Sequence, residues 1–351
     1  MQQLPILDLT KWHAGGDARR AFLYELGEAA RETGFFYLTG HGIAVSQQTA
    51  ILDLAKQFFA LPEPSKLAVQ MRHSPHFRGY TRLGDELTLG KADYREQFDI
   101  MAEQPARPGV AAAPAWYGLY GPNQWPASLP QMRTQLLSWQ QQLSELTVTL
   151  LRAFALVLQQ PVSAFDHTIS QGPYQHLKLI RYPGQASTTS KQGVGAHKDP
   201  GYLTLVLQDE HSGLEVLTEQ GWIQATPLPG AFVVNIGELL ELASNGYLRA
   251  TYHRVLSPPA GIERYSCAFF MAAQLDATVP LLPLPDELAL RAKGPASDPL
   301  NPLFYQVGQN VLKGRLRSHP DVAALHYPDI TAANSAALPH SPIIPELNYA
   351  V

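Results

Sequence analysis

Five residues in the second half of the chain have the types and spacing of a metal site with an anion anchor beside it. They are His197 and Asp199 in Ala-His-Lys-Asp-Pro, His253 in Tyr-His-Arg-Val, and Arg264 and Ser266 in Glu-Arg-Tyr-Ser-Cys. Two imidazoles and one carboxylate can hold a divalent iron ion on one triangular face and leave the other positions open for substrate and dioxygen. A guanidinium and a hydroxyl can grip a carboxylate. The combination predicts an enzyme.

The spacing has a physical reason if these residues lie on strands. Side chains at positions i and i+2 of a strand point to the same side, so a strand would aim His197 and Asp199 at one point and turn Lys198 away. The second histidine, His253, follows 56 residues after His197. That length allows several strands and turns to bring it back to the first pair.

The same alternation predicts two further rows of side chains. One inward row begins at the anion anchor and consists of Arg264, Ser266, Ala268 and Phe270. Upstream, Leu-Lys-Leu-Ile-Arg-Tyr-Pro also alternates as a strand would, which places Lys178 and Tyr182 on a common face. Both side chains could help to hold an anionic co-substrate.

The composition agrees with an enzyme and limits the alternatives. Charged residues make up 16% of the 351 residues, below the ~25% typical of soluble domains, and the apolar fraction of 45% allows a large core. The net charge of −4 argues against nucleic acid or an anionic membrane as a partner. We find no long apolar run and no signal peptide. The single cysteine, Cys267, excludes internal disulfides and favours a reducing cytoplasm, and its expected role is that of a small buried filler.

The order of expected elements divides the chain into two regions that we expect to form one integrated unit. Residues 1–125 are predicted to be a mixed α/β region, and residues 126–351 to hold the catalytic strands, with a core at about 174–274. The expected helices span 17–32, 46–60 with Ser46 as its cap, 131–159 and 304–317. Residues 105–130 read as a loop or boundary, and an irregular tail follows the last helix.

The chain resembles the isopenicillin N synthase-like family of non-haem iron oxygenases, most of which use 2-oxoglutarate. The motifs that carry the resemblance, beside the five residues above, are Pro-Ile-Leu-Asp-Leu near the start, Glu-Thr-Gly-Phe-Phe-Tyr-Leu-Thr-Gly-His-Gly-Ile at 32–43, Phe-Phe-Ala-Leu-Pro at 58–62, Gly-Leu-Glu-Val at 213–216, Val-Val-Asn-Ile-Gly-Glu-Leu-Leu-Glu at 233–241 and Ser-Asn-Gly at 244–246. The resemblance implies a mainly β fold with flanking helices, built on a jelly roll (double-stranded β-helix) whose mouth holds the metal. It also implies Fe(II), with 2-oxoglutarate and O2 as co-substrates and ascorbate as a reductant in vitro.

The resemblance assigns expected roles to named residues. The metal ligands would be His197, Asp199 and His253. The co-substrate residues would be Arg264, Ser266, Tyr182 and Lys178. The substrate pocket would include Phe270 and Thr204, and Asn235 also lies near the metal region in relatives.

The expected function is oxidation, most simply hydroxylation, of an unidentified small organic molecule, coupled to oxidative decarboxylation of 2-oxoglutarate. One alternative is an isopenicillin N synthase-type cyclase that acts without 2-oxoglutarate, but residues 77–81 do not match the clamp for its tripeptide. A zinc hydrolase could use the same ligands, although it would have no reason to keep an Arg-x-Ser anchor. A non-catalytic sensor on the same scaffold would bind metal and 2-oxoglutarate without turnover. The sequence indicates no oligomeric state.

Overall fold

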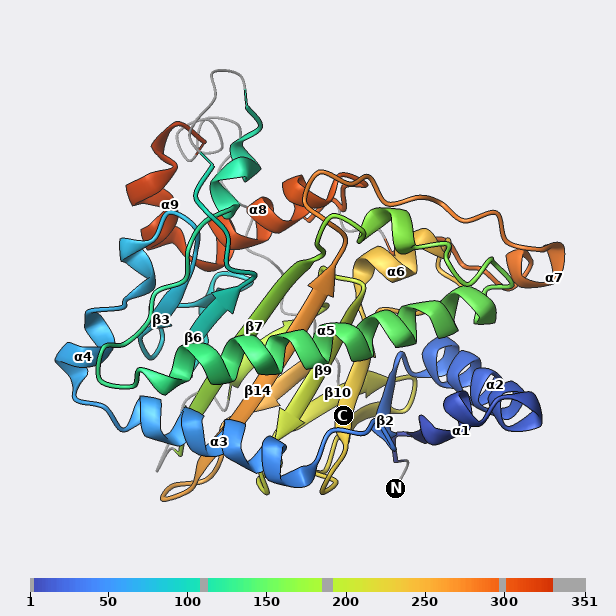
Figure 1. The fold of residues 1–351 in the computed structure, drawn as a ribbon, viewed down its shortest axis with the longest axis horizontal. Coiled ribbons are helices and arrows are strands. Elements are labelled where there is room, and N and C mark those ends of the chain that lie inside the picture. The colour runs from blue at the N-terminus through green and yellow to red at the C-terminus, as the bar shows by residue number, and fades with distance from the viewer. Residues whose placement is uncertain (1–2, 108–112, 185–191, 297–300, 331–351) are drawn as a thin grey trace.

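The computed structural model describes residues 3–107, 113–184, 192–296 and 301–330 (Figure 1). Its strands are β1 Ile6–Asp8, β2 Phe35–Thr39, β3 Gly79–Thr81, β4 Leu87–Thr88, β5 Lys91–Ala92, β6 Glu96–Met101, β7 Tyr174–Pro183, β8 Gln192–His197, β9 Leu203–Gln208, β10 Leu214–Thr218, β11 Gly221–Gln224, β12 Phe232–Ile236, β13 His253–Leu256 and β14 Glu263–Ala272. Its α-helices are α1 Thr10–Ala14, α2 Gly16–Glu32, α3 Val45–Phe59, α4 Glu63–Leu67, α5 Gln131–Val157, α6 Glu238–Ala243, α7 Asp286–Ala289, α8 Val307–Ser318 and α9 Pro320–His326.

Two sheets form the centre of the fold. The larger sheet has the strand order β1-β2-β12-β9-β14-β7-β6-β3, and the smaller has the order β11-β10-β13-β8. Side chains from both sheets pack together between them, with Ile180 and Ala268 from the larger sheet in one cluster with Val194, Leu214 and Val255 from the smaller. This arrangement confirms the predicted mainly β fold with a jelly-roll core.

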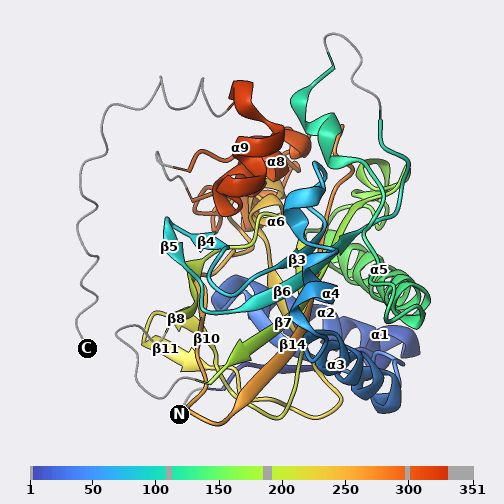
Figure 2. The same cartoon turned by 90° about the vertical axis from the view of Figure 1, so that its left-hand side faces the viewer.

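The outer face of the larger sheet carries the main hydrophobic core. Alternate residues of β7 and β14, such as Leu179 and Phe269, are fully buried in one cluster with side chains from α3 and α5. Figure 1 shows α5 and α3 running across this face of the sheet, and Figure 2 shows the layers in profile, with β7 and β14 between these helices and strands β8, β10 and β11. Because successive strand residues point to opposite sides, β7 and β14 present their other residues to the interior between the sheets.

Strands from the first hundred residues belong to the larger sheet. β2 pairs with β12, and β6 pairs with β7 over six residues, from Glu96 opposite Arg181 to Met101 opposite His176. The interior between the two sheets is therefore lined on one side by a strand of the N-terminal region.

Several boundaries differ from the sequence prediction. Helix α3, predicted to span 46–60, begins at Val45 with Ala44 as its N-cap. The Ala44 N–H donates to the Gln47 side chain, so the predicted capping by Ser46 is wrong. Helix α8, predicted to begin at residue 304, begins at Val307. The Gln306 side chain caps it by accepting a hydrogen bond from the Gln309 N–H.

The expected irregular tail is helical up to His326 in α9, and residues 331–351 lie outside the described part of the chain. Among the residues that the structure describes, no helix is long and apolar enough to cross a membrane.

Candidate active site

His197, Asp199 and His253 bring three donor atoms together between the sheets. Asp199 Oδ1 lies 3.5 Å from His197 Nε2 and 3.7 Å from His253 Nε2, and one donor atom from each residue lies within 4.8 Å of the other two. The two histidines face each other directly because β13 pairs with β8 in the register His253 opposite His197. β8 ends at His197, so Asp199 lies in the irregular segment that follows, and the predicted strand alternation is not what aligns it.

Hydrogen bonds fix the orientation of each of the three side chains. The Nδ1 atom of His197 lies 2.8 Å from the Gly195 carbonyl oxygen, and that of His253 lies 3.2 Å from the Thr251 carbonyl oxygen. Since a carbonyl oxygen only accepts, Nδ1 carries the hydrogen in both rings, and Nε2 keeps its lone pair for a metal.

The carboxylate of Asp199 is held in the same way from the larger sheet. Its Oδ2 atom accepts hydrogen bonds from Thr204 Oγ1 at 2.6 Å and from Asn235 Nδ2 at 2.8 Å, which leaves Oδ1 directed toward the histidines. Thr204, predicted to line the substrate pocket, thus orients Asp199 in the structure.

The electrostatics favour the ionised form of Asp199 and the neutral form of His253, as a cation requires, whereas His197 favours its protonated form. Burial alone would raise the pKa of Asp199, but His253 and His197 hold it well below its usual range. Burial and the neighbouring His197 lower the pKa of His253 to about 4. Burial opposes the charged form of His197 too, but the hydrogen bond and charge of Asp199 raise its pKa. A bound cation would take the place of that stabilising proton.

The donor set fits ferrous iron. Two imidazole nitrogens and one carboxylate oxygen on one side of a site, each with an outer hydrogen-bond partner, are typical of non-haem Fe(II) centres. Within the described ranges, the other group with suitable donor atoms is Asp209, Glu210 and His211. There the Asp209 carboxylate already accepts bonds from the backbone N–H groups of His211 and Tyr265.

Arg264 forms a buried anion anchor on β14. The residue is 1% exposed; its Nε donates to the His211 carbonyl oxygen and its Nη2 to Gln208 Oε1 at 2.8 Å. Its Nη1 is buried and has no hydrogen-bond partner among the residues that the structure describes. A buried guanidinium with one unused donor fits a carboxylate ligand. A Cβ atom at Gly213 would lie 2.9 Å from the Leu256 carbonyl oxygen and 3.2 Å from Arg264 Cδ, so a larger residue there would crowd the anchor.

The other predicted co-substrate residues divide into two groups. Tyr182 pairs with Arg264 across β7 and β14, its ring centroid lies 4.9 Å from the guanidinium carbon, and Ser266 follows on the same face. Lys178, in contrast, donates to Glu86 Oε1 at 2.8 Å and to Gln97 Oε1 at 3.2 Å. The structure therefore places Tyr182 and Ser266 beside the guanidinium and directs the Lys178 ammonium elsewhere.

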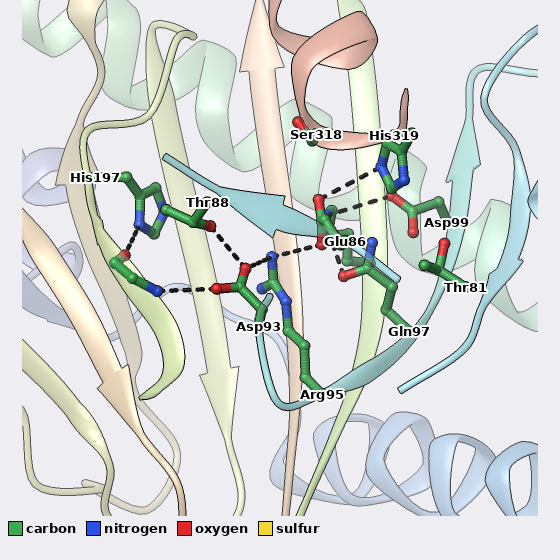
Figure 3. Close-up of polar contacts among 12 residues, drawn as sticks. Thr81, Glu86, Thr88, Asp93, Arg95, Gln97, Asp99, His197, Ser318 and His319 are labelled. Atoms are coloured by element: carbon green, nitrogen blue, oxygen red, sulfur yellow. Dashed lines mark hydrogen bonds and ion pairs between the residues drawn. The ribbon is translucent and has the colours of Figure 1, made fainter. Parts of the chain in front are cut away.

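A set of buried and half-buried polar residues beside the candidate metal ligands was missed by the sequence analysis, apart from Lys178. We call it the polar cluster; it consists of Glu86, Asp93, Arg95, Gln97, Asp99, His176, Lys178 and Arg315. Figure 3 shows most of its members next to His197 and Thr88. The alternation of Arg95, Gln97 and Asp99 could have pointed to a shared strand face, but polar residues at alternate positions normally indicate a face exposed to solvent.

Two protein-family models match parts of the chain. Residues 4–128 match the family described as non-haem dioxygenase in morphine synthesis N-terminal, and residues 173–273 match the 2OG-Fe(II) oxygenase superfamily. The second range contains His197, Asp199, His253, Arg264 and Ser266.

Individual proteins are similar over most of the chain. The 2-oxoglutarate-dependent dioxygenase frbJ of Dothideomycetidae sp. is 34% identical and covers 94% of each chain. Homoarginine-6-hydroxylase 2-ODD-233 of rice (Oryza sativa subsp. japonica) is 39% identical over 72% of this chain and 78% of its own. Among solved structures, a full-length Neurospora crassa protein in complex with alpha-KG and 5-formyluracil superposes with a TM-score of 0.73 at 26% identity, covering 90% of this chain and 96% of that one.

Proposed function

The chain belongs to the 2OG-Fe(II) oxygenase superfamily, and on that premise we propose which of its residues hold the iron and the 2-oxoglutarate. His197, Asp199 and His253 ligate Fe(II) through Nε2, Oδ1 and Nε2. The observation that carries this assignment is the convergence of these three atoms, with every outer nitrogen and oxygen already committed to a hydrogen bond. Each ligand is thereby held with its free lone pair toward one point.

Arg264 binds the far carboxylate of 2-oxoglutarate, with Ser266 and Tyr182 beside it. The support is the buried Nη1 donor of Arg264, which lacks a partner within the described part of the chain. Ser266 and Tyr182 are 2% exposed and lie on the same interior face, where a hydroxyl group can add a hydrogen bond to the carboxylate. Lys178 is left out of this group because Glu86 and Gln97 engage its ammonium.

The enzyme is an Fe(II)- and 2-oxoglutarate-dependent dioxygenase. When bound, iron supplies the redox chemistry that couples oxidative decarboxylation of 2-oxoglutarate by O2 to oxidation of a C–H bond. The protein binds and orients the reactants and keeps them out of bulk water. The relatives are named as 2-oxoglutarate-dependent, so the alternative of a cyclase that acts without 2-oxoglutarate is not favoured.

The substrate is a small organic molecule, and we infer hydroxylation as the outcome because relatives that cover about three quarters of the chain are named hydroxylases. The net charge of −4 supports a small molecule in preference to a nucleic acid. His197 is the most exposed of the three candidate ligands, with 31% of its side chain exposed against 9% for His253 and 3% for Asp199.

Metal binding tests the ligand assignment. Anaerobically purified parent protein, Asp199→Ala and His211→Ala are titrated with Fe(II), with His211 as the control because it belongs to the second group of possible donors. Asp199→Ala should lose more than the roughly 10–100-fold in affinity that removal of an outer hydrogen-bond partner causes, and His211→Ala should resemble the parent. Unchanged affinity in Asp199→Ala would refute the assignment.

Turnover tests the function itself. With Fe(II), ascorbate and air, the parent should release succinate from 2-oxoglutarate slowly without an organic substrate and faster with one. A protein that binds both iron and 2-oxoglutarate but never releases succinate would instead be a sensor.

A further inference from the structure

The polar cluster and the candidate iron ligands share one interior surface. Thr204, which donates to Asp199, pairs with Phe270 of β14, and Phe270 pairs with His176 of β7. The rings of Phe270 and His176 stack with centroids 5.1 Å apart. His176 in turn bonds to Asp99 of β6 at 2.5 Å. A continuous row of side chains thus leads from the candidate metal site to Asp99.

A second path joins the two groups on the other side. The Gly195 carbonyl oxygen that orients His197 belongs to the residue whose N–H donates to Asp93 Oδ1 at 3.0 Å. Arg95 lies between Asp93 and Glu86, with Nη2 at 3.4 Å and 2.6 Å from their carboxylates. Figure 3 shows this path from His197 across to Glu86. The polar cluster is therefore a neighbouring wall of the same site.

The charges of the polar cluster neutralise one another. Its three acids and three bases are Glu86, Asp93, Asp99, Arg95, Lys178 and Arg315. His176 adds no charge at neutral pH, because Arg315 donates to its Nδ1 while its Nε2–H donates to Asp99, and burial together with Arg315 lowers its pKa to about 3. The formal charges of these six groups sum to zero, and the buried His319 imidazole lies 3.5 Å from Glu86 beside them. Hydrogen bonds therefore count for more than net charge in deciding which ligand fits.

Three atoms of the polar cluster are buried without a hydrogen-bond partner in the described residues, namely Arg95 Nε, Gln97 Nε2 and Asp99 Oδ2, and the last two belong to one strand. The Lys178 ammonium can only donate, so the Gln97 atom that it contacts is the amide oxygen, and Gln97 Nε2 is left as a donor. Asp99 Oδ1 receives the bonds from His176 and Arg315, which leaves Oδ2 as an acceptor. Both Gln97 Nε2 and Asp99 Oδ2 are buried, and neither has a hydrogen-bond partner in the described residues.

Gln97 Nε2 and Asp99 Oδ2 belong to side chains on the same face of one strand. Gln97 and Asp99 are two positions apart on β6, so their side chains point to the same interior side. Buried polar atoms usually have a partner, which a ligand, an ion or a water molecule can supply. One donor beside one acceptor is complementary to a group that carries a hydrogen-bond acceptor beside an N–H.

We propose that Gln97 and Asp99 recognise the organic substrate, and that the part they bind is an amide, lactam, ureide or similar nitrogen-containing group with an N–H beside a carbonyl-type acceptor. This assignment rests on the proposed function of the neighbouring site. The N–H donates to Asp99 Oδ2 and the acceptor receives Gln97 Nε2–H. Beside these atoms, Glu86 from the segment before β4 engages Lys178.

Two nearly isosteric variants each change one of the two hydrogen-bonding groups that the proposed ligand would meet. In Asp99→Asn the amide oxygen can keep the bond from His176, and an NH2 donor then replaces the Oδ2 acceptor. In Gln97→Glu a carboxylate oxygen can keep the bond from Lys178, and an acceptor replaces the Nε2 donor. Gln175→Glu is the matched control, because the same chemical change then falls on the opposite face of β7, where Gln175 donates to Ser144.

The experiment measures succinate release above the rate without organic substrate for thymine and 2-piperidone, each compared with its N-methylated form. The parent should respond to thymine or to 2-piperidone and not to the methylated partner. Asp99→Asn and Gln97→Glu should each raise the half-saturating concentration at least tenfold. Iron content and the Kd for 2-oxoglutarate should change less than twofold in both variants, and Gln175→Glu should resemble the parent.

Several results would overturn the proposal while the iron and 2-oxoglutarate assignments stand. They are no response to either N–H compound, an equal response to the methylated forms, unchanged half-saturation in both variants, or an equal loss of 2-oxoglutarate affinity. Absence of all succinate release, with or without organic compounds, would overturn the proposed function and this inference together.

Discussion

Replacing Arg264 by Ala should weaken 2-oxoglutarate binding and leave the iron site intact. Arg264 lies on β14, and its two internal hydrogen bonds go to His211 and Gln208, not to any of the three candidate ligands. The unused Nη1 donor is the group that a carboxylate would meet. Removal of one partner of a buried charged pair costs about 2–5 kcal/mol, which corresponds to an affinity loss between about 30-fold and a few thousand-fold.

Two milder variants calibrate this loss. Arg264→Lys keeps the charge but cannot reproduce the planar fork that Gln208 and a carboxylate would share, so it should recover only part of the affinity. Ser266→Ala removes a single hydroxyl and should cost about 1 kcal/mol, or roughly fivefold in Kd. The expected order of Kd values is parent, Ser266→Ala, Arg264→Lys and Arg264→Ala.

The assay is an anaerobic calorimetric titration of 2-oxoglutarate into the Fe(II)-loaded protein. Iron content and Tm of each variant are measured beside it, since Arg264 also packs against Gly213 and its loss could disturb the strand. Equal Kd values for the parent and Arg264→Ala would refute the anchor role. An iron content that falls with the 2-oxoglutarate affinity would show that the two sites are not independent.

Three further results are expected. Thr204→Val, which removes the hydroxyl that orients Asp199 without changing the side-chain volume much, should weaken Fe(II) binding about tenfold, whereas full affinity would show that the 2.6 Å contact has no such role. Asp199→Glu should bind Fe(II) better than Asp199→Ala but below the parent, because the longer side chain keeps the charge and displaces the oxygen; metal titration decides this. Burial and Arg315 lower the pKa of His176 from 6.5 to about 3, so the unfolded chain binds more protons in that window and stability should fall as pH drops from 6.5 toward 3. Between pH 7 and pH 5, the free energy of unfolding in urea should fall less for His176→Gln than for the parent. An equal fall in both proteins would contradict the role of His176.

The candidate iron and 2-oxoglutarate residues could be predicted from the sequence because they lie in short, strongly patterned segments. Arg264 and Ser266 are two positions apart on a strand, as expected from alternation. Asp199 was predicted from strand alternation, but it lies beyond the end of β8. Side chains from β9 and β12 align it instead. The alternation of side chains along a strand does not extend to residues that follow its end.

The polar cluster could not be predicted because its members come from distant parts of the chain. Glu86 precedes β4, Gln97 and Asp99 lie on β6, and Arg315 reaches Asp99 from α8. Polar residues at alternate positions usually mark a solvent-exposed strand face, but every residue of β6 is buried in the structure. The hydrogen bond from Lys178 to Glu86 could not be predicted for the same reason, since the two residues lie 92 positions apart in the chain.

The position of β6 in the larger sheet has a consequence for the exchange of segments between relatives. β6 ends at Met101, whereas β7, the first of the strands that surround the candidate iron ligands, begins at Tyr174. A crossover anywhere between these points would replace the strand that carries Gln97 and Asp99 and retain all of the candidate iron and 2-oxoglutarate residues. If Gln97 and Asp99 recognise the substrate as proposed, chimeras of this kind would sample new selectivities in one recombination step, provided that the incoming β6 preserves a partner for Arg315.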